Sequence, residues 1–194
     1  MRRVVVSIAS CLVALGLMTG GAYADGAGPT NQVQVQNTHD GEARVASRAK
    51  AVEDRGPTVA PDNEATAYAS CTSCRTVAVA IQVVLAVGPA SDSRPTNSAV
   101  AVNYECHFCA TFAYANQVLL NTDSDVHLGP EAEQQLHDLR DQVDHVAASD
   151  EAFDQMSADL DGLTQQMAAV VQSEIDHAGA TAHRDDERHV DQAA

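Results

Sequence analysis

The sequence predicts a helix-rich α+β fold made of two strand–Cys-x-x-Cys–helix units followed by an antiparallel helical hairpin. The first observation is an internal repeat, because residues 71–85 match residues 106–120 without a gap. The second is an apolar seam of helical spacing within residues 130–178. The predicted organisation is a signal peptide at 1–24, a disordered linker at 25–62, a duplicated Cys-x-x-Cys core at 63–122, a helical hairpin at 123–178 and a flexible tail at 179–194.

The N-terminus has the pattern of a secretory signal peptide. Two arginines precede an apolar run over residues 4–18, and Ala22 and Ala24 form the small-x-small pattern that a signal peptidase accepts. The run is shorter than the roughly 20 residues that span a bilayer. A lipoprotein box ending at Cys11 fits less well, because the apolar run continues past it. We therefore expect cleavage after Ala24, secretion or attachment to the cell envelope, and no membrane span in the mature chain.

The charge excludes several classes of partner. The chain has 27 acidic and 11 basic residues and a net charge of −16, which loss of Arg2 and Arg3 with the signal takes to −18. A field this negative repels nucleic acid and anionic lipid. The partner class that remains is another protein, bound through the helical hairpin, and no residue pattern identifies it.

Residues 25–62 have the composition of a linker. They contain three of the six prolines and many polar or charged residues. The alternating residues 31–37 fit a strand, but that strand would be isolated. Disorder is therefore the prediction for this segment.

The duplicated core leaves helix and strand in competition. Alternating stretches at 65–69 and 99–103 predict a short strand before each cysteine pair. After each pair, a period of 3.6 joins the cysteines to the other shared residues on one stripe, whereas the β-branched residues of the first copy favour a strand. We predict helices, with the stripes Cys71, Cys74, Ala78, Gln82 and Leu85, and Cys106, Cys109, Ala113, Gln117 and Leu120.

The segment after Gly129 predicts two helices. Pro130 suits a first helical position, and Ser149 can cap a second helix. Apolar residues recur three or four positions apart, which predicts two antiparallel helices packed along a seam. The seam residues are Ala132, Leu136, Leu139, Val143 and Val146, then Phe153, Met156, Leu160, Leu163, Met167 and Val170.

Four cysteines, Cys71, Cys74, Cys106 and Cys109, remain after signal cleavage. An even number in an exported protein predicts disulfides, and both local bridges and bridges between the copies stay open. The first alternative is a structural zinc site of four thiolates, although a 35-residue offset exceeds the usual spacing of about 15–20 residues. The second is a thiol–disulfide oxidoreductase, because a Cys-x-x-Cys at a helix start favours the thiolate.

No other pattern indicates catalysis. The sequence contains neither His-Glu-x-x-His, nor Gly-x-Ser-x-Gly, nor a phosphate-binding glycine loop. We therefore predict no catalytic residues and no cofactor, with zinc as the alternative.

The stretch Cys-Thr-Ser-Cys-Arg-Thr-Val-Ala-Val-Ala-Ile-Gln and its second copy resemble a family of secreted or envelope-associated actinobacterial proteins of unknown function. Members share the duplicated Cys-x-x-Cys-x-Thr-x-Ala-x-Ala-x-Gln pattern, and the resemblance covers roughly residues 62–121. Some members carry the label "putative peptide zinc metalloprotease protein". Because this chain lacks the zinc-protease motif, the resemblance implies no protease activity. The expected function is an exported, non-catalytic structural or interaction protein held by disulfides, with an envelope oxidoreductase as the enzyme alternative.

Overall fold

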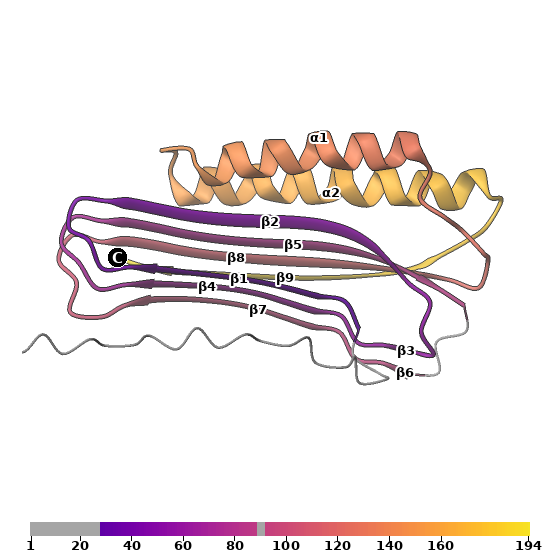
Figure 1. Ribbon diagram of the computed structural model, residues 1–194, viewed down its shortest axis with the longest axis horizontal. Helices are drawn as coiled ribbons and strands as arrows, with labels where there is room; N and C mark the ends of the chain where they lie inside the picture. Colours follow the sequence, from indigo (N-terminus) through magenta and orange to yellow (C-terminus); the bar gives the residue numbers. More distant parts are fainter. Residues whose placement is uncertain (1–27, 89–91) are drawn as a thin grey trace, which may run out of the picture.

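The computed structural model describes residues 28–88 and 92–194, and the predicted signal peptide at 1–24 lies outside these residues. Figure 1 shows an elongated, layered molecule in which two stacked sheets run lengthwise and two helices run lengthwise over one of them. In chain order the elements are β1 (Thr30–Asn37), β2 (Ala43–Asp54), β3 (Thr58–Val59), β4 (Asp62–Ala69), β5 (Arg75–Val87), β6 (Asp92–Ser93), β7 (Thr96–Asn103), β8 (Ala110–Thr122), α1 (Pro130–Ala147), α2 (Phe153–His177) and β9 (His183–Ala193).

The strands wind into a parallel solenoid of three rungs. Each rung runs along a strand of one sheet, turns, and returns along a strand of the other. The first sheet has the order β1-β4-β7, the second has the order β2-β5-β8-β9, and β3 pairs with β6. All pairings are parallel except that of β9 with β8. The rungs are therefore copies of one strand–turn–strand unit, and equivalent residues in neighbouring rungs are 32 to 35 positions apart.

A buried asparagine opens each rung, and the three asparagines form a ladder. Asn31, Asn63 and Asn97 each follow a proline by two positions. The Nδ2 of Asn31 donates to Oδ1 of Asn63 at 2.8 Å, and the Nδ2 of Asn63 donates to Oδ1 of Asn97 at 2.7 Å. Asn63 Nδ2 also reaches the carbonyl of Ala80 in the facing sheet, at 3.1 Å. Because an unpaired buried amide is costly, this ladder ties the rungs to one register.

Small apolar side chains fill the space between the two sheets. Alternate residues of β1 and β4 are buried, as the pleat of a strand requires, and they face alternate residues of β5 and β8. These inward residues are Val33, Val35, Ala65, Ala67, Ala78, Ala80, Ala113 and Ala115. Since alanine dominates, the sheets enclose a thin core.

A larger core lies between the second sheet and the helices. The outward residues of β5 and β8 meet the apolar faces of α1 and α2, which Figure 1 shows covering that sheet. Eight residues of the predicted seam are buried, whereas Val146, Phe153 and Val170 are partly buried; the eight are Ala132, Leu136, Leu139, Val143, Met156, Leu160, Leu163 and Met167. The helices therefore bury their apolar faces against β-structure as well as against each other.

The predicted helix-rich fold is wrong, because strands make up 48% and helices 26% of the structure. The segments after each cysteine pair are the strands β5 and β8, where helices were expected. Both strands are buried on two faces, between the inner core and the helices. Such strands are apolar on both sides and lose the alternation that would distinguish them from a helix.

Two segments expected to lack structure are strands. Within the predicted disordered linker at 25–62, β1 and β2 form the first rung, and within the predicted flexible tail at 179–194, β9 pairs with β8. Both segments are polar because only one side of β1 is covered and β9 lies at an edge. Among the described residues, neither α1 nor α2 combines the length and apolar character of a membrane-crossing helix.

Candidate functional site

The four cysteines lie in the turns that join the two sheets at one end of the solenoid. In each turn the residue two positions before the returning strand has left-handed backbone: Gly41 has φ 71°, Ser73 has φ 55° and Phe108 has φ 57°. This conformation reverses the chain in few residues, and it is easiest for glycine. The second and third turns stack directly, since Thr72 pairs with His107. The repeat of the rungs therefore brings the two Cys-x-x-Cys units together.

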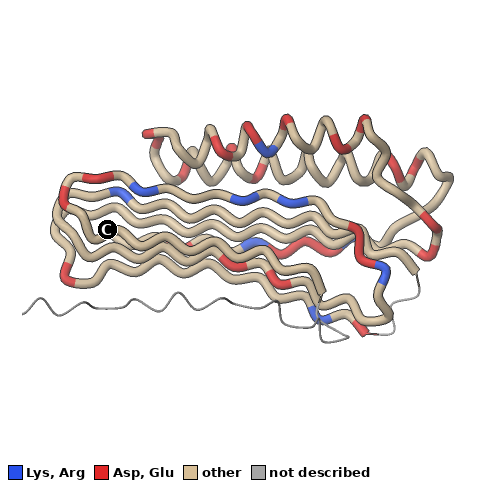
Figure 2. The backbone as a smooth tube through the Cα atoms, viewed as in Figure 1, with Lys and Arg blue, Asp and Glu red and all other residues tan. Residues whose placement is uncertain are grey.

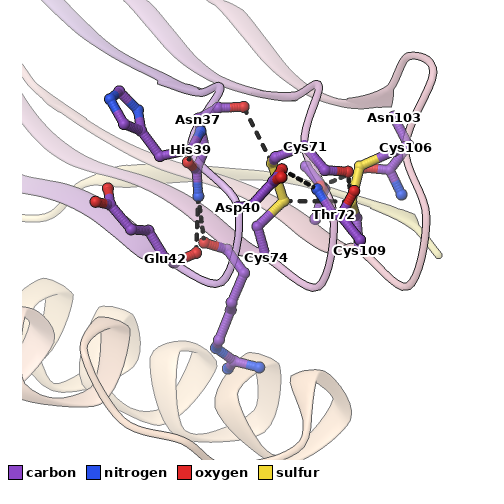
Figure 3. Close-up of a disulfide and its surroundings, with 12 residues drawn as sticks. Asn37, His39, Asp40, Glu42, Cys71, Thr72, Cys74, Asn103, Cys106 and Cys109 are labelled. Atoms are coloured by element: carbon purple, nitrogen blue, oxygen red, sulfur yellow. Dashed lines mark hydrogen bonds between the residues drawn. A yellow bond between two sulfur atoms is a disulfide. The ribbon is translucent and has the colours of Figure 1, made fainter.

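The sulfur atoms form one compact cluster. Cys71 is joined to Cys74 and Cys106 to Cys109, with Cα–Cα separations of 6.2 and 6.0 Å. Figure 3 shows the two sulfur pairs side by side, and Cys74 Sγ lies only 3.2 Å from Cys109 Sγ. This contact is no hydrogen bond, because disulfide sulfur carries no proton. One ligand atom from each of the four cysteines fits within 4.8 Å of the others.

The cluster is largely closed to solvent. Cys71, Cys74 and Cys109 are buried, and Cys106 is partly exposed. Main-chain carbonyls surround the sulfurs: the carbonyl of Asn37 lies 3.3 Å from Cys71 Sγ, and that of Cys71 lies 3.0 Å from Cys109 Sγ. Cys106 is therefore the most exposed of the four cysteines.

The first rung has no cysteine in its turn. By register, His39 and Glu42 occupy the positions of the second rung's cysteine pair. In Figure 3 their side chains are directed away from the sulfurs, and both contact Arg44, at 3.0 Å from His39 and 3.4 Å from Glu42. The cysteine stack therefore spans two rungs only.

The elements beside the cysteine pairs differ from those that the oxidoreductase alternative requires. A strand follows each pair, so the helix start on which the oxidoreductase alternative depended is absent. The nearest cation in the sequence, Arg75, lies over the Phe153 ring at 4.3 Å and donates to the carbonyl of Glu151. Burial lowers the pKa of Arg75, with nearby acids opposing the shift. The Arg75 side chain thus serves the helix–sheet interface.

The donor set nevertheless fits a zinc ion when the cysteines are reduced. In a tetrahedral zinc site the Zn–S distance is about 2.3 Å, which places sulfurs about 3.8 Å apart. Four thiolates confined within 4.8 Å need only small movements to reach that arrangement. Zinc and the disulfides exclude each other, because a disulfide offers no thiolate.

Sequence reasoning missed a second polar cluster, at the opposite end of the solenoid. Arg55 donates to the carboxylates of Glu53 and Asp125 and to the carbonyl of Val126, and His127 lies beside it. The hydrogen bond from Arg55, with its charge, lowers the pKa of Asp125. These residues are distant in sequence, so only the winding of the rungs could reveal the cluster.

The fold and the site together define a class: a three-rung parallel β-solenoid, covered by a helical hairpin on one sheet, with two stacked Cys-x-x-Cys turns. Comparison with protein-family models, with curated proteins and with solved structures finds no match. The resemblance to the actinobacterial family stays a prediction from the repeated motif.

Proposed function

We propose that the protein is an exported, non-catalytic structural or interaction protein, in which a disulfide closes each Cys-x-x-Cys turn at one end of the solenoid. The main support for this proposal is the cysteine cluster, which is mostly buried and is formed by cysteine pairs in two stacked turns. A pair used for exchange with substrates would need an exposed, activated thiol. The burial of three of the four cysteines instead supports a structural role.

Export and disulfides support each other in this proposal. Disulfides persist in oxidising compartments and are rare in the cytosol. The predicted signal peptide would deliver the chain to such a compartment, with Asp25 as the first residue after cleavage. The net charge keeps nucleic acid and anionic lipid out of the list of partners.

The test is thiol titration with metal analysis on protein secreted by its natural route. We expect Asp25 at the N-terminus, no free thiols in the native protein, four after reduction and denaturation, and no stoichiometric zinc. One zinc per chain, or a cysteine pair that turns over dithiol substrates, contradicts the proposal. Intact Met1 in the cytoplasm contradicts the export.

A zinc-binding module is the second candidate, and the confinement of four sulfurs within 4.8 Å favours it. Under reducing conditions it would bind one zinc per chain and lose structure with a chelator. The Cys74→Ser variant removes one ligand and should weaken zinc binding strongly, whereas Ser73→Ala, beside it, should not. If the reduced protein folds equally with and without zinc, this candidate is wrong.

A further inference from the structure

The two ends of the solenoid stack are finished in different ways. At the third rung, β9 pairs with β8, the Nδ2 of Asn97 donates to the carbonyl of Glu187 at 2.7 Å, and the Ala101 N–H donates to the Asp191 carboxylate at 2.8 Å. At the first rung, no strand among residues 28–88 and 92–194 pairs with the outer edge of β1 or β2. We call this uncovered end, formed by β1 and β2, the first-rung face.

The asparagine ladder stops unfinished at the first-rung face. Asn63 and Asn97 each accept an amide hydrogen bond from the rung before. Asn31 has the same place in its rung, is fully buried, and has no partner for its Oδ1. The first-rung face thus keeps the hydrogen-bonding pattern to which a further rung would attach.

Two cations stand where the other rungs have neutral side chains. Arg48 aligns with Ala80 and Ala115, and Lys50 aligns with Gln82 and Gln117. In the inner rungs Gln117 Nε2 donates to Gln82 Oε1 at 2.8 Å, so these positions continue from rung to rung. In the first rung, Lys50 Nζ instead donates to the Thr30 carbonyl at 2.8 Å and Arg48 reaches the Gln32 carbonyl at 3.5 Å.

Both side chains therefore lie across the open end, above the edge of β1. Figure 2 shows basic positions spaced along β2, in a molecule whose charge is otherwise mainly acidic. Lys50 is also the only lysine in the sequence. Inward-pointing charges on an edge strand are a known means of preventing strand addition.

Two physical effects would oppose self-association through this face. A second copy would remove both cations from water without offering a counter-ion, which is costly. If two copies met about a twofold axis through Ala49 of β2, Arg48 of each copy would face Lys50 of the other. Like charges placed opposite each other across paired strands are destabilising.

We propose that the first-rung face is a strand edge able to pair with a second copy of this chain, and that Arg48 and Lys50 prevent this pairing in the wild-type protein. The stack of strands then does not extend beyond three rungs, because β9 covers one end and the charges of Arg48 and Lys50 prevent pairing at the other. This inference does not depend on the state of the cysteines.

The test replaces both cations with the neutral residues found at the same positions of the second and third rungs. Wild-type protein should sediment as a monomer, and the R48A/K50Q variant should sediment as a dimer. Association should stop at the dimer, because β9 still covers the other end of each copy and an isologous contact closes on itself. Hydrogen exchange should show new protection in residues 43–54 of the variant.

Two matched controls separate this mechanism from a change in net charge. Arg94→Ala removes an exposed cation away from the first-rung face and should leave the protein monomeric. R48K/K50R keeps both charges and should do the same. If R48A/K50Q does not fold, the single variant Lys50→Gln is tested in its place. We expect it to dimerise, but more weakly than the double variant would. A folded, monomeric variant, a dimeric wild-type protein, or protection confined to other strands overturns the proposal.

Discussion

At the scale of single residues, the asparagine ladder concentrates the polar chemistry of the interior. Asn63 is its middle member: its Nδ2 lies within hydrogen-bonding distance of the carbonyls of Ala80 and Asn116 and of Asn97 Oδ1. Its Oδ1 accepts from Asn31. One side chain therefore satisfies groups in all three rungs.

Replacing Asn63 with alanine should lower the free energy of unfolding by about 3 kcal/mol or more, since each buried group left without a partner costs roughly 1–3 kcal/mol. Urea unfolding measures the loss. Gln34→Ala, on the exposed face of β1, is the control and should stay within about 0.5 kcal/mol. Equal unfolding midpoints for the two variants would show that the ladder does not hold the rungs.

Phe108 has a strained backbone conformation, and its exposed side chain does not offset that strain. Its φ of 57° is unfavourable for any residue other than glycine, and its side chain is 91% exposed. The first rung has Gly41 at this place. We expect Phe108→Gly to raise the free energy of unfolding by up to about 1 kcal/mol, after allowance for the greater freedom of glycine in the unfolded chain. Phe108→Ala keeps the strain and should give no such gain in thermal melts.

At the scale of elements, α2 stabilises the molecule by covering β5 and β8. Leu160 is fully buried in this layer. Leu160→Ala should cost about 2–5 kcal/mol, because it removes apolar burial and leaves a cavity. Asp141→Ala, on the solvent side of α1, should change the free energy of unfolding by no more than about 0.5 kcal/mol. Thermal melts that cannot distinguish these two variants would contradict the packing of the helices.

The end of β2 is joined to the segment before α1 through Glu53. Burial opposes its ionisation, but the hydrogen bond from the Leu128 N–H and the Arg55 guanidinium outweigh burial and lower the pKa of Glu53 from its ordinary value. Because the pKa is lower in the folded state, the stability that this carboxylate contributes is complete above about pH 5 and is lost as the pH falls through the folded pKa.

Glu53→Gln should therefore be less stable than the wild type at neutral pH, and the difference should shrink on acidification. Urea midpoints measured from about pH 3 to pH 7 test this linkage. Glu105→Gln, at an exposed residue of a turn, serves as the control. A difference that is independent of pH would rule out the charged form of Glu53 as the source of the stability.

The elements differ in how far the sequence could predict them. The helices were predictable because one face of each is apolar, so Leu136 and Leu160 recur at helical spacing. The two cysteine turns were predictable as a pair because both residues repeat. The strands β5 and β8 were not, since burial on both faces removes their alternation. The first rung was missed because His39 and Glu42 replace the cysteines, although the recurring Pro-x-Asn pattern marks all three rungs.

At the scale of the whole molecule, the acidic groups are distributed over the surface, including both helices (Figure 2). A net charge of −16 makes these groups repel one another in the compact state. Screening is stronger at higher salt, with a Debye length of about 8 Å at 0.15 M. The melting temperature should therefore rise with sodium chloride from low ionic strength to about 0.15 M. A melting temperature that falls over this range would show that attractive ion pairs, such as Arg188 with Asp161, outweigh the repulsion.

The path of the chain has a mechanical consequence. Thr30 begins β1 at the end of the solenoid opposite the cysteine turns, whereas Ala193 ends β9 beside Thr111, at the cysteine end. A pull on residues 28 and 194 would therefore act along the strands. Hydrogen bonds between strands run across them, so this pull would load many bonds together instead of opening them one by one. The solenoid would resist stretching along its long axis far better than peeling from its side.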